Sequence, residues 1–246
     1  MRVLARLGLA AIGLSVVLSL VVAVTISSSS QTTPAPGGVY VEGLVGQPGV
    51  LSPLLADSNP CDAEIAALVF SGLTTRDASG AIVPALAASW QVSPDTTTYT
   101  FTLRTDARWH DGVSVSPDDV VFTVASLQDE DTPATPWLRA FWRGVVAERL
   151  DAQRVRLTLP QPYAPFLEYT TLGLLPAHIL KDTGEDGRDA YASRPIGTGP
   201  YQIIERNRLH TVLAPASDAL PTMLARLEFR YYPDRRALLV VSDGGS

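Results

Sequence analysis

The sequence is poor in cysteine and in basic residues. Cys61 stands alone among 246 residues, which excludes an internal disulfide framework and any CxxC metal or redox site. The 19 basic residues are outnumbered by 25 acidic ones, and the net charge of −6 argues against a nucleic-acid-binding surface. Proline and glycine, 19 and 18, are too few for a fibrous chain, and a hydrophobic fraction of 46% excludes wholesale disorder.

The motifs of the common enzyme classes are also absent. There is no Gly-x-Ser-x-Gly, His-Glu-x-x-His, Walker A or Rossmann pattern. His110, His178 and His210 are far apart and lack the spacing of a metal site. Asp118 and Asp119 could form an acid/base pair, but they follow a helix-start signal, where acids complement the helix dipole. We therefore predict a non-enzyme without a metal or cofactor.

A long uncharged run occupies the N-terminus. Arg2 and Arg6 precede Leu7–Ile26, a stretch about as long as the ~20 residues that span a bilayer. The positive flank favours the cytoplasmic side, so the rest of the chain is expected to face outward. We predict that residues 1–26 form a signal peptide or a retained membrane anchor, and that the Ser/Pro/Gly-rich residues 27–38 form a flexible tether. Any contact with the membrane is expected through this segment only.

Apolar and polar residues alternate at five places in residues 39–246, which predicts strands. One strand is predicted to start at Val39. The other four are predicted to cover Thr98–Arg104, Val155–Leu159, Tyr201–Glu205 and Leu227–Tyr231. Because strands and helices do not alternate strictly, the order predicts an α+β (mixed α/β) fold with a mixed sheet, preceded by the N-terminal hydrophobic helix.

Helix signals are fewer. Ser116, followed by Pro117 and two acids, predicts a helix start, and helical spacing predicts a second helix over Asp62–Phe70 with Gly72 as its C-cap. Pro84–Trp90 is predicted to be a short helical or irregular stretch. The aromatic, proline-flanked segment Trp137–Arg143 is predicted to be irregular.

Several segments together resemble the peptide/nickel family of extracytoplasmic solute-binding proteins that feed ABC importers. The segments are Leu68–Leu73, Leu86–Trp90, Val92–Asp95, Thr98–Arg104, Trp109–Gly112, Ser116–Thr123, Val155–Leu159, Ala164–Phe166, Leu175–Leu180, Pro195–Tyr201 and Phe229–Asp234. Trp-His-Asp-Gly and Ser-Pro-Asp-Asp-Val-Val-Phe-Thr are the most specific of them. The first is a turn at the end of a strand, and the second is a capped helix start. Both therefore mark the scaffold of the family's first lobe rather than a ligand site.

The resemblance implies a periplasmic-binding-protein-like first lobe over residues 39–246, incomplete relative to the two-lobed family. It also implies an extracytoplasmic location, a short peptide or similar small solute as ligand, and an ABC permease as partner. A protein of this kind closes two lobes on its solute by a hinge motion. The alternative is a membrane-tethered interaction or sensory module that is derived from the same lobe and has no transport role.

The resemblance also implies candidate ligand-binding residues. They are Asp57, Ser58, Asn59 and Cys61 in the loop before the first helix, and Trp137, Phe141 and Trp142 in the aromatic segment. Turn and cap chemistry is a competing interpretation of Asp57 and Asn59, and core packing is one for the tryptophans.

The chain departs from the family pattern in three ways. Asp95-Thr96 stands where the family usually has Asp-Gly, and Ala214–Asp218 lacks the usual Asn-Pro and aromatic pair. The sequence stops shortly after Asp234, whereas family members continue into a second lobe. We therefore interpret the chain as a truncated form and hypothesise that it binds no ligand with useful affinity, because half a cleft cannot enclose a solute.

Overall fold

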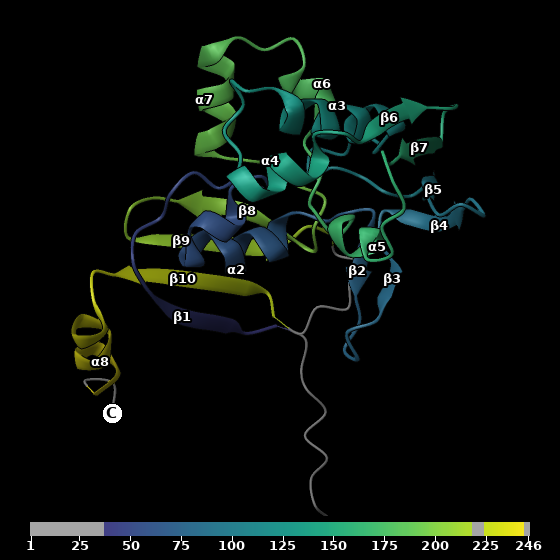
Figure 1. The fold of residues 1–246 in the computed structure, drawn as a ribbon. Coiled ribbons are helices and arrows are strands. Elements are labelled where there is room, and N and C mark those ends of the chain that lie inside the picture. Colours follow the sequence, from purple (N-terminus) through teal and green to yellow (C-terminus); the bar gives the residue numbers. More distant parts are fainter. Residues whose placement is uncertain (1–36, 218–223, 244–246) are drawn as a thin grey trace, which may run out of the picture. The chain divides into compact units, whose positions relative to one another are not determined.

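The computed structural model describes residues 37–217 and 224–243 (Figure 1). The predicted signal or anchor at 1–26 and all but the last two residues of the predicted tether lie outside these ranges. Among the residues that are described, no helix is both long and apolar enough to cross a membrane.

Two four-stranded sheets and one hairpin organise the described chain. The first sheet has the order β1 (Val39–Val45), β10 (Arg226–Tyr232), β9 (His210–Pro215) and β8 (Tyr201–Arg206). The second has the order β4 (Ala87–Val92), β5 (Thr98–Leu103), β7 (Arg154–Thr158) and β6 (Val146–Arg149). The hairpin pairs β2 (Thr74–Arg76) with β3 (Ile82–Pro84). Only the β1–β10 pairing is parallel among the named strands, so the first sheet is mixed.

Short helices connect the strands. They are η1 (Ala56–Ser58), α2 (Pro60–Val69), α3 (Pro117–Gln128), α4 (Pro136–Trp142), α5 (Phe166–Tyr169), α6 (Ala177–Leu180), α7 (Glu185–Ser193) and α8 (Arg235–Asp243). The predicted helix start at Ser116 is confirmed, with Pro117 in the first turn and Asp119 completing a capping box.

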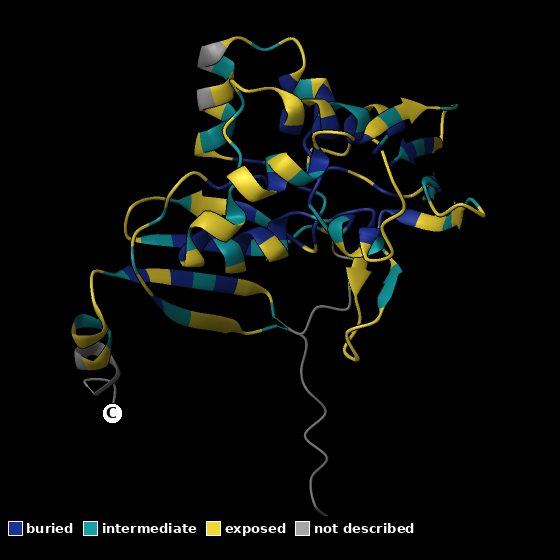
Figure 2. Ribbon diagram, viewed as in Figure 1, coloured by how far each residue is buried: buried dark blue, intermediate teal, exposed yellow. Residues whose placement is uncertain are grey.

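Each sheet has its own hydrophobic core (Figure 2). Ile65 and Val69 of α2 pack with Leu213 and Phe229 of the first sheet. On the second sheet, the alternation predicted for Thr98–Arg104 is confirmed: its apolar residues are buried, and its threonines are partly exposed. The buried face of α3, with Val120 and Val124, completes the core of the second sheet. The predicted mixed sheet is therefore confirmed in the first sheet, whereas the pairs of the second sheet are all antiparallel.

Three local predictions are wrong. Pro84–Trp90 contains the start of β4, because antiparallel pairing with β5 overrides the helix preference of its alanines. Trp137–Arg143 lies mostly in α4, where Pro136 at the first turn is compatible with a helix. Helix α2 ends with Phe70 as C-cap, so Gly72 is not the cap; a Cβ at Gly72 would lie 2.4 Å from the Thr170 carbonyl oxygen.

The buried carboxylate of Asp119 joins three segments. It accepts hydrogen bonds from the Ser116 N–H (2.8 Å), the Ala177 N–H (2.9 Å) and the Trp109 indole N–H (3.4 Å). Asp119 is 2% exposed. Asp118, its neighbour, is half-exposed and pairs only with Arg149 among the described side chains. The two acids therefore act separately, one as a structural acceptor and one as a surface ion.

A second junction holds the Gly-Thr-Gly turn against the end of α2. The Gly199 N–H donates to the Val69 carbonyl (2.8 Å), and a Cβ at Gly197 would lie 1.8 Å from the same oxygen. The Gly197 N–H donates to Nδ1 of His110 (3.1 Å), so Nε2 carries the proton and donates to the Gly199 carbonyl (3.0 Å). These contacts give the turn a packing role.

The Asp118–Asp119 pair offers a matched test of burial. We expect Asp119→Asn to destabilise the fold by about 3 kcal/mol, because the amide loses an acceptor oxygen at a buried site with four donors, the Ser116 hydroxyl being the fourth. Asp118→Asn should cost no more than about 0.5 kcal/mol, as for other exposed ion pairs. Urea unfolding of both variants measures this, and equal costs would contradict the assignment.

The departure at Thr96 predicts a stabilising substitution. Thr96 has φ +56°, and no other non-glycine residue in the described ranges has a positive φ. A β-branched residue in this region is strained, so Thr96→Gly should stabilise the fold by about 0.5–1 kcal/mol. Thr97→Gly, beside it on ordinary backbone, should destabilise it instead. Thermal unfolding that moves both variants in the same direction would refute this explanation.

His110 predicts acid sensitivity. Burial lowers the pKa of His110 below its ordinary value of 6.5, against smaller opposing effects of the Gly199 hydrogen bond and the Asp111 charge. Because the unfolded state binds the proton more readily, stability contributed by neutral His110 is present above about pH 6.5 and declines as pH falls toward the folded pKa. His110→Gln should flatten the decline between pH 8 and 5, measured by urea unfolding. His110→Gln is compared with the unmodified chain at each pH, and a decline that is unchanged in His110→Gln would contradict this assignment.

Candidate functional site

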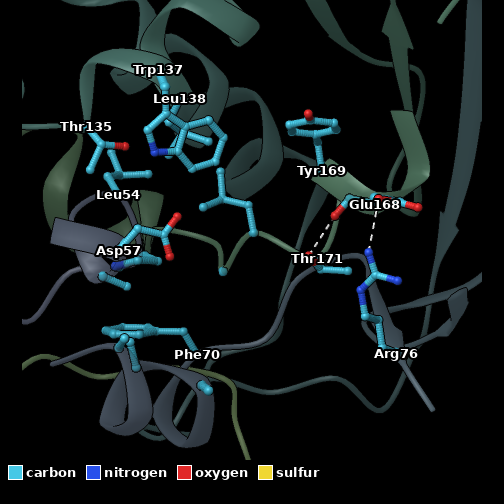
Figure 3. Close-up of a pocket in the computed structure, with 17 residues that line it drawn as sticks. Leu54, Asp57, Phe70, Arg76, Thr135, Trp137, Leu138, Glu168, Tyr169 and Thr171 are labelled. Carbon is cyan, nitrogen blue, oxygen red and sulfur yellow. Dashed lines mark hydrogen bonds and ion pairs between the residues drawn. The ribbon is translucent and has the colours of Figure 1, made fainter. Parts of the chain in front are cut away.

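A pocket of about 350 Å³ opens between the η1–α2 region and helices α4 and α5 (Figure 3). Its apolar wall includes Leu54, Phe70 and Leu138, all of them buried. Two of the predicted ligand-binding residues, Asp57 and Trp137, line it from opposite elements. The fold therefore brings together one residue from each of the two segments that the sequence singled out.

The polar residues before α2 have different roles: Asp57 lines the pocket, and Asn59 caps the helix. Asp57 is exposed and makes no hydrogen bond or ion pair with any described residue. Ser58 donates its hydroxyl to the Leu55 carbonyl (2.6 Å). Asn59 is the N-cap of α2: its side-chain oxygen accepts from the Cys61 N–H (3.0 Å), and its amide donates to the Gln47 carbonyl (3.0 Å). Cap chemistry thus accounts for Asn59 but not for Asp57.

Cys61 faces the core rather than the pocket. Its side chain is buried, and Sγ lies 3.5 Å from the Val45 carbonyl oxygen. Burial raises the pKa of the thiol, and the charges of Asp62 and Glu64 raise it further. The thiol therefore stays protonated at neutral pH, which is unsuited to a nucleophile or a metal ligand.

The aromatic segment lies in the seven-residue helix α4, and its rings have two different environments. Trp137 is 49% exposed and lines the pocket, with its ring edge-on to Tyr169 at 6.3 Å between centroids. Phe141 stacks on Tyr169, with 3.7 Å between the ring centroids. Trp142 is buried and packs against Phe166 at 5.7 Å. Core packing therefore accounts for Trp142. Phe141 packs against Tyr169, whose ring lines the pocket. A ligand-binding role for the predicted residues remains a prediction.

Sequence reasoning missed several residues of the pocket. Arg76 of β2 and Glu168 of α5 form an ion pair at its rim, 3.0 Å apart and half-exposed (Figure 3). Thr135, before α4, lines it with a hydroxyl that is buried without a hydrogen-bond partner among the described residues. The Thr135-Pro136 pair is a helix-start signal that could have located Thr135. No comparable signal marks Arg76 or Glu168, because the two meet only through tertiary packing.

The arrangement is suited to binding. The pocket combines apolar walls with a few polar groups, as small-molecule sites do. Its charged residues are two carboxylates and one guanidinium, without an adjacent histidine, cysteine or serine nucleophile in its lining. In the part of the chain that the structure describes, no group of three or more His, Cys, Asp or Glu residues could hold a metal ion.

A second hollow of about 520 Å³ lies between α3, α7 and the loop at Val50–Leu55. Phe122, Leu175 and Tyr191 contribute to its lining, with Arg188 and Asp129 at its polar part. None of the predicted ligand-binding residues lines it. The first pocket is therefore the candidate site.

A family model describing the middle part of the bacterial extracellular solute-binding proteins, family 5, matches residues 81–242. This match covers more than half of the chain. The chain belongs to family 5 of the bacterial extracellular solute-binding proteins. Trp137 and the rest of the aromatic segment fall inside the matched range, whereas Asp57 precedes it.

Named relatives of this family 5 chain include binding proteins. Protein XP55 of Streptomyces lividans is 34% identical over 173 residues, which is 66% of this chain and 29% of that protein. The periplasmic oligopeptide-binding protein OppA of Haemophilus influenzae is 31% identical over 210 residues, 74% of this chain and 38% of OppA. The crystal structure of NikZ from Campylobacter jejuni, in complex with Ni(L-His), superposes with a TM-score of 0.74 and 26% identity, over 86% of this chain and 42% of NikZ. The chain thus spans less than half the length of each.

Proposed function

We propose that this chain supplies the first lobe of an extracytoplasmic solute-binding protein that captures short peptides, or solutes of similar size, for an ABC importer. The observation that carries the proposal is the pocket that Asp57 and Trp137 both line within a family 5 fold. The name of the Haemophilus influenzae relative, an oligopeptide-binding protein, supports peptides as the ligand class.

The geometry supports weak binding by this chain on its own. The pocket is open, and Trp137 at its rim is 49% exposed. Solute sites commonly enclose 70–90% of the ligand surface, which one lobe cannot do. A second lobe would supply the opposite wall and exclude water. We therefore propose that the first lobe determines which part of the solute docks first and that closure supplies most of the affinity.

The test combines calorimetry with the indole N–H signal of Trp137 in a two-dimensional NMR spectrum. We expect no saturable heat from a mixed di- to hexapeptide pool at micromolar concentration. At millimolar concentration, the tripeptide Ala-Leu-Ala should shift the Trp137 indole signal, which the variant Trp137→Phe identifies by its disappearance. The dissociation constant should lie in the millimolar range, about 4 kcal/mol of binding free energy.

Trp90 provides an internal control. It is partly exposed on β4 and does not line the pocket, so its indole signal should stay in place. A Trp137 signal that does not move at millimolar peptide would overturn the proposed function for this pocket. Tight, micromolar binding would instead overturn the inference that one lobe is insufficient.

A further inference from the structure

Five aromatic side chains form a continuous cluster that ends at the pocket. Phe141 stacks on Tyr169, and its other neighbours are Tyr163 at 5.6 Å and Phe166 at 6.3 Å between ring centroids. Tyr169 in turn meets Trp137 edge-on at 6.3 Å. Of these five residues, Trp137 and Tyr169 line the pocket. The cluster therefore presents a wall of two aromatic rings to the pocket.

The ring of Tyr169 is fixed by its own neighbours. Phe141 covers its face with 13° between the two ring planes, and the Tyr169 hydroxyl lies 3.4 Å from the Tyr163 hydroxyl. Phe141 is anchored in turn by Phe166, which is fully buried. A side chain that is already held in one conformation loses little entropy when a solute docks on it. The aromatic wall is therefore preorganised for binding.

Helix α2 leaves room on the other side of the pocket. Ala63, Ala66, Ala67 and Phe70 line the pocket, and their spacing places them on one face of the helix. Figure 3 shows Phe70 and Trp137 on opposite sides of the pocket. Because three of these four side chains are only methyl groups, a space of about 350 Å³ remains. Small-molecule sites begin at about 300 Å³, so this space suits one side chain of a solute rather than a whole peptide.

An unpaired hydroxyl indicates independently that this space receives a ligand. Thr135 is 7% exposed and lines the same pocket, and its buried hydroxyl has no hydrogen-bond partner among the described residues. The Thr135 N–H donates to the Leu54 carbonyl (3.0 Å), so the residue is held in place without the use of its hydroxyl. Buried hydroxyls are nearly always hydrogen-bonded, so this one has a position left for a polar atom of the solute.

The chemistry of the space fits a planar aromatic group. Aromatic pairs gain attraction beyond their buried area when they stack with an offset or meet edge to face, with centroids about 4.5–7 Å apart. Trp137 is 49% exposed, so its ring has free surface for a further ring. We propose that Trp137, Tyr169 and the alanines of α2 form a slot that selects an aromatic side chain of the solute. This inference rests on the proposed function and adds the class of side chain that the first lobe prefers.

Three peptides that differ only in the central side chain test the preference: Ala-Phe-Ala, Ala-Leu-Ala and the same peptide with cyclohexylalanine at its centre. The saturated ring of cyclohexylalanine buries at least as much apolar surface as the ring of phenylalanine, so apolar burial alone predicts equal or tighter binding. We expect Ala-Phe-Ala to bind about fivefold more tightly than the cyclohexylalanine peptide, because only the aromatic ring pairs with Trp137 and Tyr169. The indole signal of Trp137 in the 246-residue chain reports each titration.

Two pairs of variants locate the slot. Tyr169→Leu should remove the preference for Ala-Phe-Ala, whereas Tyr163→Leu should keep it, because Tyr163 does not line the pocket. Ala67→Leu fills the slot from an exposed position of α2 and should weaken the binding of Ala-Phe-Ala about fivefold or more. Glu64→Leu, at an exposed position of the same helix outside the pocket lining, should leave that binding unchanged.

The outcomes separate the two proposals. If the cyclohexylalanine peptide binds as tightly as Ala-Phe-Ala, or if Ala67→Leu leaves the binding of Ala-Phe-Ala unchanged, the aromatic slot is wrong and the solute-binding pocket stands. Equal loss of the preference in Tyr169→Leu and Tyr163→Leu would overturn the slot as well. If no peptide moves the Trp137 signal, the proposed function itself fails. A preference for Ala-Phe-Ala that disappears in Tyr169→Leu and persists in Tyr163→Leu supports the slot.

Discussion

The hydrogen bonds to the Asp119 carboxylate fix the relation between parts of the chain that are nearly 60 residues apart. Ser116 begins α3, Trp109 closes the preceding turn, and Ala177 begins α6. A carboxylate offers about four acceptor positions on two oxygens, so one side chain can bridge all three. The Thr123 hydroxyl extends the junction by accepting from the Leu175 N–H (2.9 Å). With α3 fixed in this way, its C-terminal carbonyls hold Arg139 and hence α4, which carries Trp137.

The junction at the Gly-Thr-Gly turn acts on the opposite wall of the pocket. Gly199 binds the last carbonyl of α2, and His110 binds Gly197 and Gly199 through both ring nitrogens. Helix α2 contributes Ala66 to the pocket, and Phe70 follows directly at its C-cap. The most specific sequence motifs, which contain His110 and Asp119, therefore fix the elements that form the pocket. Neither motif contains Asp57 or Trp137.

Local signals predicted elements well where apolar and polar residues alternate along a strand or where a cap precedes a helix. The Thr98–Arg104 alternation and the Ser116 helix start are such cases, since both depend on neighbours along the chain. Pairing across the fold could not be predicted in the same way: β1 joins β10 in parallel, and β4 forms from a segment with helix preference. The site shows the same division. Asn59 could be recognised as a cap, but only the tertiary structure places Asp57 and Trp137 in the lining of one pocket.

Three residues that line the pocket lie outside every segment that carries the family resemblance. Asp57, Thr135 and Trp137 belong to none of them, and Asp57 precedes the matched range at 81–242 as well. The resemblance thus defines a scaffold, and OppA, named for oligopeptides, and NikZ, solved with Ni(L-His), show that this scaffold serves chemically different ligands. Selectivity must then come from the groups that line the pocket rather than from the scaffold.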